Sequence, residues 1–138
     1  MFVLSKTLSI SSSDRRQLID ITREVEEFVR IGQMASGLCV ISVPHATAAI
    51  IANENERGLV RDILSQIEQL FPTSGNYAHN EIDDNADAHL AASFLGHSKT
   101  FPVINQKLSR GTWQNIFLVE LDGPRSRRTV NLQLIGEK

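Results

Sequence analysis

Cysteine is almost absent from this chain, which has only Cys39 among its 138 residues. One cysteine cannot form an internal disulfide, so the disulfide-rich class of secreted scaffolds is excluded and a reducing compartment is indicated. Cys39 lies in the apolar run LCVISV, where we expect it to be buried as a small hydrophobic side chain.

The sequence also lacks an excess of charge of one sign, because 14 Lys and Arg residues stand against 16 Asp and Glu residues. A nearly balanced chain has no strong electric field that would draw it to nucleic acid or to an anionic membrane. We therefore expect neither as a partner, and any anion that the protein binds must be held by local groups.

Long hydrophobic runs are missing as well. No window approaches the roughly 18 apolar residues of a membrane span, and the N-terminal MFVLSKTLSISSSDRRQ lacks the basic start and continuous apolar run of a signal peptide. The cytoplasm is therefore the expected location. With 41% hydrophobic residues, the chain suits one compact domain over residues 1–138.

What is present is a clear apolar periodicity. Apolar and polar residues alternate over 2–10, which predicts a half-buried strand. The serines at 11–13 and the following Asp14 are typical of a helix start, and the apolar spacing of three and four after them predicts an amphipathic helix over 14–33.

The run GLCVISVPHATAAIIANEN is rich in β-branched and small residues, and only Pro44 interrupts it. It predicts two strands, over 38–43 and 47–52, or one long strand kinked at the proline. Apolar residues at helical spacing then predict a second amphipathic helix over 59–71, which ends before Pro72.

A short helix over 87–95 is predicted to stop at Gly96, with Leu90, Phe94 and Leu95 on its apolar face. Strand composition follows over 99–104, 113–121 and 127–135. Because strands and helices do not alternate regularly, the predicted fold class is α+β: a single domain with a mostly antiparallel sheet or sandwich, two longer helices and one short helix.

Residues 80–102, NEIDDNADAHLAASFLGHSKTFP, crowd polar groups around a short apolar run. Asn85 and His89 are four positions apart and Asp87 begins the same helix, so its first turn can present an amide and an imidazole in one direction. The alternative is an ordinary helix with a solvated loop, because a single histidine is more often a hydrogen-bonded structural residue.

Further polar residues lie where strands end. His45 follows Pro44, Asn53 and Glu54 come at the far end of the next predicted strand, and His79 lies in a polar loop. Neighbouring carboxylates and amides make these histidines candidates for a metal site or for a general acid and base. Spacing alone supports this only weakly, because no His-Glu-x-x-His motif is present.

Three other motifs each allow two interpretations. In GHSKT, Ser98 and Lys99 can cradle an anion, or the motif can be a simple helix stop. In GTWQ, Trp113 and Gln114 are neighbours and are predicted on opposite faces of a strand, so one of them packs and the other can face a ligand. The alternative is that Trp113 is an aromatic residue of the core or of an interface.

The third motif, ELDGPRSRR, is predicted to be a turn bracketed by Glu120 and Arg125. An arginine at this place can hold a phosphate or carboxylate with two parallel hydrogen bonds. A surface salt bridge is the alternative.

Together, the segments PHATAAIIANEN, YAHN, NADAHLAASFLG, PV, GTWQNIFLVELDGPRSRR and LIGE resemble the YjbQ-type family, often described as secondary thiamine-phosphate synthases, in one colinear order over residues ~5–137. The resemblance implies an α+β domain with an antiparallel sheet and a homotrimer whose polar site lies near the subunit contacts. This chain departs from the family at Asn105 and Gln106, where an Asp-Gly turn is expected.

The resemblance also implies site residues. The expected catalytic group is His45, Glu54, His79, Asn85, Asp87 and His89. Together with Ser98 and Lys99 of the GHSKT motif, the residues expected to bind substrate are Asn53, Trp113, Gln114, Glu120 and Arg125. His97 is left out, because the family has a small residue there. We expect His45, His79 and His89 to converge on one pocket.

Thiamine-phosphate synthesis joins a pyrimidine methyl diphosphate to a thiazole phosphate with loss of diphosphate, so positive charge must stabilise the leaving group. Arg125, Lys99 and a divalent metal ion are the candidates. Three imidazoles from His45, His79 and His89 favour Zn²⁺, whereas diphosphate usually pairs with Mg²⁺, which prefers oxygen ligands such as Glu54 and Asp87. Both ions therefore stay open as cofactors for a small phosphorylated substrate.

Two other classes of function remain. In a metal-dependent hydrolase, a histidine-held metal would activate water and Glu54 would act as the base. In a trimeric binding protein, the same residues would hold a metal or a small ligand without catalysis.

Overall fold

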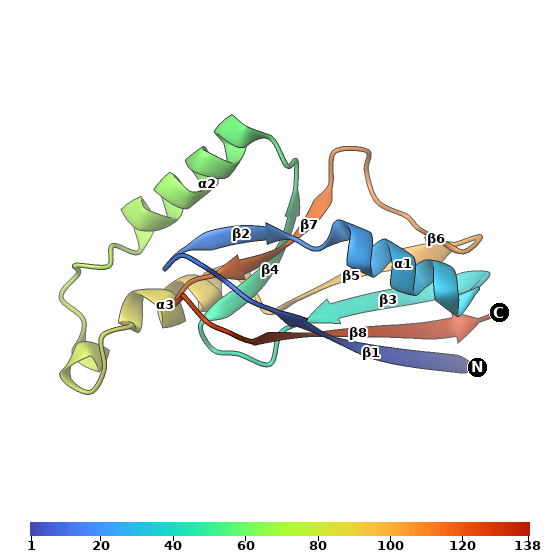
Figure 1. Ribbon diagram of the computed structural model, residues 1–138, viewed down its shortest axis with the longest axis horizontal. Helices are drawn as coiled ribbons and strands as arrows, with labels where there is room; N and C mark the ends of the chain where they lie inside the picture. The colour runs from blue at the N-terminus through green and yellow to red at the C-terminus, as the bar shows by residue number, and fades with distance from the viewer.

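The computed structural model describes residues 1–138 and contains two antiparallel sheets and three α-helices (Figure 1). The first sheet has the order β1-β8-β3-β5-β6 and consists of Phe2–Ile10, Arg128–Glu137, Ser36–Ser42, Ser98–Ile104 and Lys107–Leu108. The second has the order β2-β7-β4 and consists of Gln17–Asp20, Asn115–Glu120 and Ala48–Asn53. Every strand pairing is antiparallel, so the predicted α+β class is confirmed.

The main core lies between the five-stranded sheet, one face of the three-stranded sheet and α1, which spans Thr22–Gly32. Strand β8 alternates buried and exposed residues, and its Leu132 and Leu134 face this core. On α1, Val25, Phe28 and Val29 are buried against it at the spacing of three and four that predicted a helix. Burial of such side chains contributes roughly 1.5–3 kcal/mol each.

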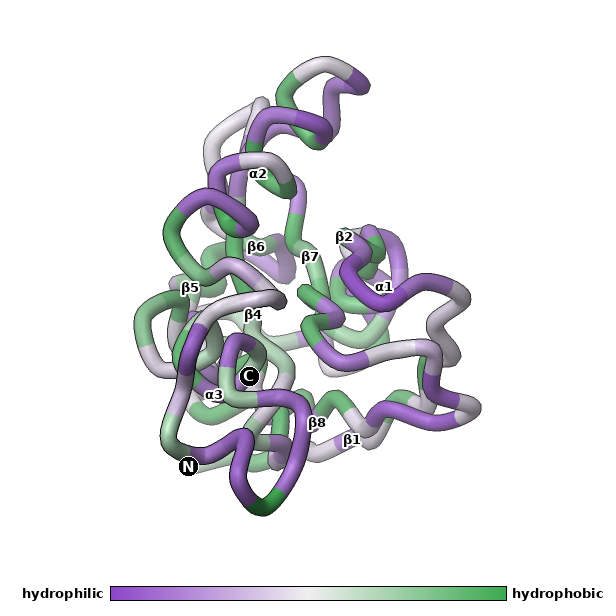
Figure 2. The backbone as a smooth tube through the Cα atoms, turned by 90° about the vertical axis from the view of Figure 1, so that its left-hand side faces the viewer, coloured by the Kyte–Doolittle hydropathy of each residue, from purple (hydrophilic) through white to green (hydrophobic).

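A second, smaller core joins the three-stranded sheet to α3, which spans Ala86–Leu95. Ala88, Ala91 and Ala92 pack with Ala49 of β4, and their small side chains allow the helix to approach the sheet closely. Figure 2 shows mostly hydrophobic residues along β4 and β7 and mostly hydrophilic residues in the outer loops. The position of α3 is therefore fixed by packing on the sheet.

Helix α2, Arg57–Leu70, extends away from the sheets (Figure 1). Its start is capped by Glu56, whose carboxylate accepts hydrogen bonds from the backbone N–H groups of Gly58 at 2.6 Å and Leu59 at 2.9 Å. These two hydrogen bonds lower the pKa of Glu56 below its ordinary value. Only Ile67 of this helix is buried. No helix in the structure has both the length and the apolar character needed to cross a membrane.

The predicted helix over 14–33 is wrong in its first part. Gln17–Asp20 forms β2, in which Leu18 pairs with Val119 of β7, and α1 begins only at Thr22. The carboxylate of Asp20 accepts from the backbone N–H of Thr22 at 2.9 Å and from its hydroxyl at 2.6 Å, and so marks the true helix start. The serine run does not cap a helix, because Ser12 donates instead to Glu120 at 2.7 Å.

The two-strand interpretation of the run around Pro44 is confirmed, since β3 and β4 belong to different sheets. The predicted strand over 113–121 begins only at Asn115, and Trp113 lies in the preceding turn with 69% of its surface exposed. The apolar face predicted for α3 is also wrong in part. Leu90 and Phe94 are 40% and 77% exposed, because the alanines on the other face pack against the sheet.

Candidate functional site

The beginning of α3 is held by a buried charge network. Asp87 is completely buried, and its carboxylate accepts from Arg15 Nη2 at 3.2 Å and from Arg16 Nη2 at 2.8 Å. Both arginines come from the connection between β1 and β2, and Arg16 also donates to the backbone oxygen of Phe71 at 2.6 Å. A buried carboxylate with two guanidinium partners has little capacity left for a substrate. In this arrangement Asp87 anchors the helix.

His79 and His89 lie next to each other at this end of the molecule. His79 belongs to the short 3-10 helix η1, Ala78–Glu81, and its ring stands edge to face with that of His89, with 4.8 Å between the centroids. Both rings line a hollow of about 330 Å³ together with Tyr77 and Leu90. The sequence-predicted pairing of imidazole groups around α3 is thus present for these two histidines.

Asn85 immediately precedes α3 and connects His79 to a further carboxylate. Its Oδ1 lies 3.1 Å from His79 Nε2, and its Nδ2 donates to Asp122 Oδ2 at 2.9 Å. Asn85 is buried, whereas the ring of His79 is exposed. The amide therefore contacts the exposed imidazole from the protein side.

His45 lies between β3 and β4, and its Nε2 accepts from the backbone N–H of Thr129 at 2.8 Å. Burial lowers the pKa of His45, the nearby Arg128 and Arg125 lower it further, and Glu120 partly opposes this effect. The ring is therefore neutral at pH 7. Because Nε2 uses its lone pair on Thr129, the proton of the neutral ring lies on Nδ1.

A second hollow, of about 340 Å³, is lined by His45, His89 and His97, with Ser93 at its wall. No carboxylate lines this hollow. His89 lines both hollows, so it lies beside His45 on one side and beside His79 on the other.

Glu120 does not reach either hollow. It is completely buried, and Arg128 Nε donates to its Oε1 at 2.9 Å. Burial raises the pKa of Glu120, but hydrogen bonds from Arg128, the backbone N–H of Asp122 and Ser12 outweigh burial and keep the pKa below its ordinary value. Glu120 thus stays ionised in a buried ion pair and is positioned to support the loop that follows it.

Arg125 lies in that loop, and its side chain is 45% exposed. Its Nε donates to the backbone oxygen of Asp122, and its Nη2 donates to the Asp122 carboxylate, both at 3.0 Å. These bonds fix the guanidinium near His45, and its remaining N–H groups are free to bind an anion.

The GHSKT motif lies at the C-terminal end of α3. Lys99 Nζ donates to the backbone oxygens of Leu95 at 3.2 Å and Ser98 at 3.4 Å. The free carbonyl groups at this end of a helix attract cations and repel anions. The geometry therefore favours a helix stop over an anion cradle, although β5 starts with Ser98 and Lys99 close to the second hollow.

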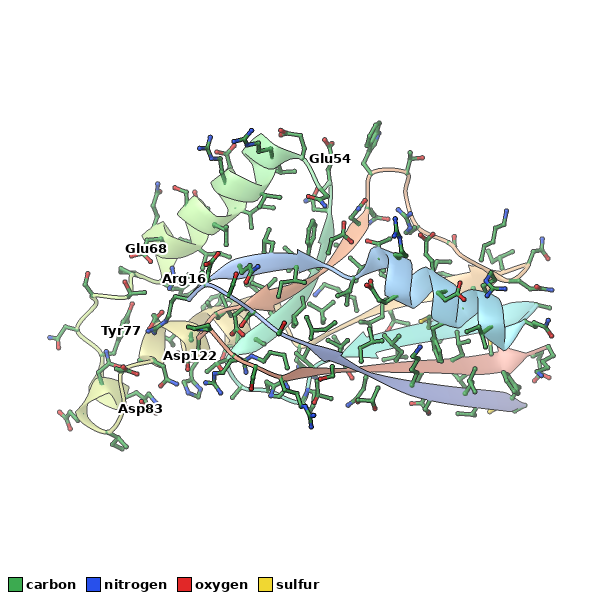
Figure 3. All side chains as sticks on the ribbon, in the orientation of Figure 1. Arg16, Glu54, Glu68, Tyr77, Asp83 and Asp122 are labelled. Atoms are coloured by element: carbon green, nitrogen blue, oxygen red, sulfur yellow. The ribbon has the colours of Figure 1, made fainter.

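The other sequence-predicted residues lie at the far end of the three-stranded sheet. Asn53 pairs with Asn115 at the start of β7, whereas Glu120 ends the strand. Five residue steps of about 3.4 Å separate the two ends by roughly 17 Å. Figure 3 shows Glu54 on the side of the molecule opposite Asp83 and Asp122.

Trp113 and Gln114 belong to this far group as well. Trp113 is exposed, and Gln114 Oε1 accepts from the backbone N–H of Gly111 at 2.6 Å, which closes the turn before β7. Within one chain, the sequence-predicted site is therefore divided into two groups. The group at the His79 end consists of His45, His79, Asn85, Asp87, His89, Ser98, Lys99, Glu120 and Arg125, and the far group consists of Asn53, Glu54, Trp113 and Gln114.

The expected three-histidine metal site fits this geometry only in part. His79 and His89 are adjacent and can serve as two ligands. His45 uses Nε2 to accept from Thr129, and a ring that carries its proton on Nδ1 then has no lone pair for a metal. No three His, Cys, Asp or Glu side chains are grouped as a metal would require, so the metal stays a prediction that needs further ligands.

Two larger hollows lie beside α1, with volumes of about 640 and 650 Å³. Charged side chains of both signs line them, including Glu26, Arg30 and Arg110. None of the sequence-predicted site residues borders either hollow. Size alone therefore does not single out the site, and the grouping of histidines does.

The structure adds two residues that the sequence did not single out. His97 lines the second hollow, and its only local signal was its place directly after Gly96. Asp122 binds Asn85 and Arg125, and its signal was its position directly before the Gly-Pro turn. Both could have been suspected as polar residues flanking a chain reversal.

The fold and this site define a small α+β protein with histidine-lined hollows at one end of a helix. The model of the family described as UPF0047 protein YjbQ-like matches residues 6–137, and the chain belongs to this family. UPF0047 proteins of Archaeoglobus fulgidus and Methanothermobacter thermautotrophicus are both 46% identical to it, over 89% and 93% of this chain and 95% and 90% of their own length.

Solved structures resemble the whole chain. A YbjQ-like protein of unknown function from Sulfolobus solfataricus P2 superposes with a TM-score of 0.97 at 51% identity, covering 99% of both chains. A hypothetical protein from Aeropyrum pernix K1 superposes with a TM-score of 0.94 at 42% identity, covering 97% of this chain and 99% of its own. The predicted membership of the YjbQ-type family is thus confirmed.

Proposed function

We propose that the protein acts on a small phosphorylated substrate at the His79 end, in a reaction of the thiamine-phosphate synthase type. The supporting observation is the hollow of about 340 Å³ that is lined by His45, His89 and His97 and by no carboxylate. Imidazole N–H groups donate to phosphate oxygens, and the absence of acidic groups avoids repulsion. Arg125 adds a permanent positive charge near His45.

In this reaction, the bond between the pyrimidine methylene carbon and the diphosphate oxygen breaks, and its electron pair leaves with the diphosphate. The lone pair of the thiazole nitrogen forms the new carbon–nitrogen bond. The protein residues stabilise the charge that develops on the leaving oxygen. Arg125 and the Nδ1–H of His45 are the donors for this role, and His89 or His97 can protonate the departing diphosphate.

The test is an assay with pyrimidine methyl diphosphate and thiazole phosphate, in which thiamine phosphate and diphosphate are both quantified. We expect equal amounts of the two products from the wild-type protein and about 100-fold less from His89→Ala. Lys107→Ala is the matched control, because Lys107 is exposed and lines only a hollow beside α1. No product from the wild type, or equal product from His89→Ala, would refute the proposal.

We further propose that the protein is a homotrimer in which the two groups of site residues meet between subunits. In support, Glu54 and the exposed Trp113 lie at the opposite end of β7 from the histidines and cannot join them within one chain. Light scattering should then give three times the chain mass of 15.4 kDa. A monomer would contradict the proposal.

Subunit complementation tests whether the site is shared. Glu54→Gln and His89→Ala should each be inactive alone. When the two variants are refolded together in equal amounts, about a quarter of the shared sites should receive an intact Glu54 from one subunit and an intact His89 from its neighbour, and activity should return. The co-refolded mixture should stay inactive if both residues belong to one subunit's site.

A metal-dependent function is the second candidate, and the adjacency of His79 and His89 favours it. Two neighbouring imidazoles suit Zn²⁺ better than Mg²⁺, and a neighbouring subunit would have to supply the remaining ligands. Elemental analysis of protein purified without chelator should find zinc or magnesium in the wild type and less in His89→Ala. Equal metal content in both proteins would exclude His89 as a ligand. Hydrolysis of the diphosphate substrate without thiazole phosphate would favour a hydrolase over a synthase.

A further inference from the structure

Asp122 joins the loop after β7 to two segments that are far away in the sequence. Its carboxylate accepts from Asn85 Nδ2 at 2.9 Å and from Arg125 Nη2 at 3.0 Å, and Arg15 Nε lies 3.7 Å away. Its side chain is only 13% exposed, and its backbone N–H donates to Glu120 Oε2 at 3.0 Å. Figure 3 shows Asp122 close to the start of α3, on the same side as Tyr77 and Asp83. The carboxylate is therefore held in one place from several sides.

The position of this carboxylate dictates how the Asn85 amide is oriented. An ionised carboxylate only accepts hydrogen bonds, so the amide must turn its NH₂ group toward Asp122. The opposite orientation would place two oxygens against each other. With Nδ2 bound to Asp122, Oδ1 necessarily faces His79.

The orientation of the amide in turn decides which nitrogen of His79 carries the proton. Asn85 Oδ1 is only an acceptor and lies 3.1 Å from His79 Nε2, so Nε2 must be the donor. In the neutral ring, Nδ1 then has the free lone pair. This is the nitrogen that can take a proton or bind a ligand.

We infer that Asp122 is a positioning residue that fixes the tautomer of His79 through Asn85. Asp122 touches neither hollow and acts only through its partners. The same carboxylate orients Arg125, so one residue arranges both the anion-binding guanidinium and the imidazole. The catalytic consequence rests on the proposed function, whereas the tautomer itself does not.

The experiment is a long-range ¹H–¹⁵N correlation spectrum of the protein with ¹⁵N-labelled histidine, recorded without substrate at alkaline pH, where imidazole rings are neutral. The His79 signals are assigned by their loss in His79→Gln. In the wild type we expect a protonated Nε2 and a bare Nδ1. A protonated Nδ1 in the wild type would overturn the inference, whatever any variant does.

Two variants separate positioning from a purely structural role. Asp122→Ala removes the acceptor, and the ratio of the two His79 tautomers should shift by about fivefold toward that of the unfolded chain, as expected for loss of one hydrogen bond. Asp122→Asn keeps a carbonyl oxygen that can accept from Asn85 and should retain the wild-type tautomer. An unchanged tautomer ratio in folded Asp122→Ala would overturn the inference, and so would a shifted ratio in Asp122→Asn.

These spectra also distinguish failure of the inference from failure of the proposed function. The tautomer is measured without substrate, so it is informative even if no thiamine phosphate forms. Conversely, a synthase with the other tautomer would retain the proposed function and lose the role of Asp122. If Asp122→Ala does not fold, a protonated Nδ1 in the wild type or a shifted ratio in Asp122→Asn would still overturn the inference.

Discussion

His79 and His89 stand edge to face, with 4.8 Å between their ring centroids, at the beginning of α3. The contact depends on residues far away in the sequence, because Arg15 and Arg16 anchor Asp87 in the same helical turn. A polar site on a small domain requires such support, since exposed side chains are otherwise mobile. The contact leads to specific expectations for substitutions.

His89→Ala should abolish binding of the phosphorylated substrate and leave the fold intact. Helix α3 packs through Ala88, Ala91 and Ala92, whereas His89 is only half-buried, so its loss should cost on the order of 1 kcal/mol in unfolding free energy. Urea unfolding and substrate binding are measured on the same preparation. A variant that unfolds far more easily but keeps full activity per folded molecule would make His89 a structural residue.

Asp87→Asn should destabilise the protein by about 3 kcal/mol, because it removes the charge of a completely buried carboxylate that pairs with Arg15 and Arg16, and it leaves Arg16 with only the half-exposed Glu68 as a charge partner. The midpoint of urea unfolding measures this loss. Glu27→Gln is the matched control, because Glu27 pairs with Arg30 on the exposed surface and should leave the midpoint unchanged. Similar midpoints for Asp87→Asn and the wild type would show that the helix anchor is unimportant.

His45 should make the protein less stable in mild acid. Because folding lowers its pKa, the unfolded chain binds the proton more readily, and stability is lost as the pH falls from the ordinary value of about 6.5 through the lower pKa of the folded state. His45→Gln keeps an acceptor for the Thr129 N–H but does not titrate. Unfolding free energies at pH 8 and pH 5 should differ less for this variant than for the wild type. An equal pH dependence would assign the acid sensitivity to other groups.

Gln106→Gly should stabilise the protein by about 1 kcal/mol. The substitution removes the cost of a left-handed backbone conformation, and this gain exceeds the additional entropy that glycine loses on folding. Asn105 and Gln106 form the turn between β5 and β6 with φ values of 49° and 67°. Such turns favour glycine at the second position. Thermal unfolding measures the gain, and a lower melting temperature would show that the Gln106 side chain makes a compensating contact.

Local patterns predicted the helices better than the strand edges. The bounds of α2 and α3 agree with the predicted ranges within about two residues, whereas β2 exists because Leu18 pairs with Val119 about a hundred positions later. Leu18 fits the helical spacing equally well, so no local signal separates the two states. Trp113 was assigned to a strand by composition, but the turn closed by Gln114 excludes it from the ladder.

The site was predictable to a similar degree. Asn85 and His89 were paired by helical spacing, and His79 was a candidate from its place in a polar loop before the family resemblance supported it. The buried pairing of Asp87 with Arg15 and Arg16 depends on a connection seventy positions earlier, which sequence spacing cannot reveal. His97 was omitted because the family pattern has a small residue at its position, yet its side chain lines the second hollow.

The most direct measurement is a titration of the wild-type protein with inorganic diphosphate, followed through the ring proton signals of its four histidines. If the histidine-lined hollow binds the phosphate part of the substrate, the signals of His45, His89 and His97 should shift saturably, and Lys107→Ala should behave like the wild type. His89→Ala should remove the saturable shifts of the other two rings. Histidine signals that stay unchanged at high diphosphate concentration would contradict the assignment of this hollow as the substrate site.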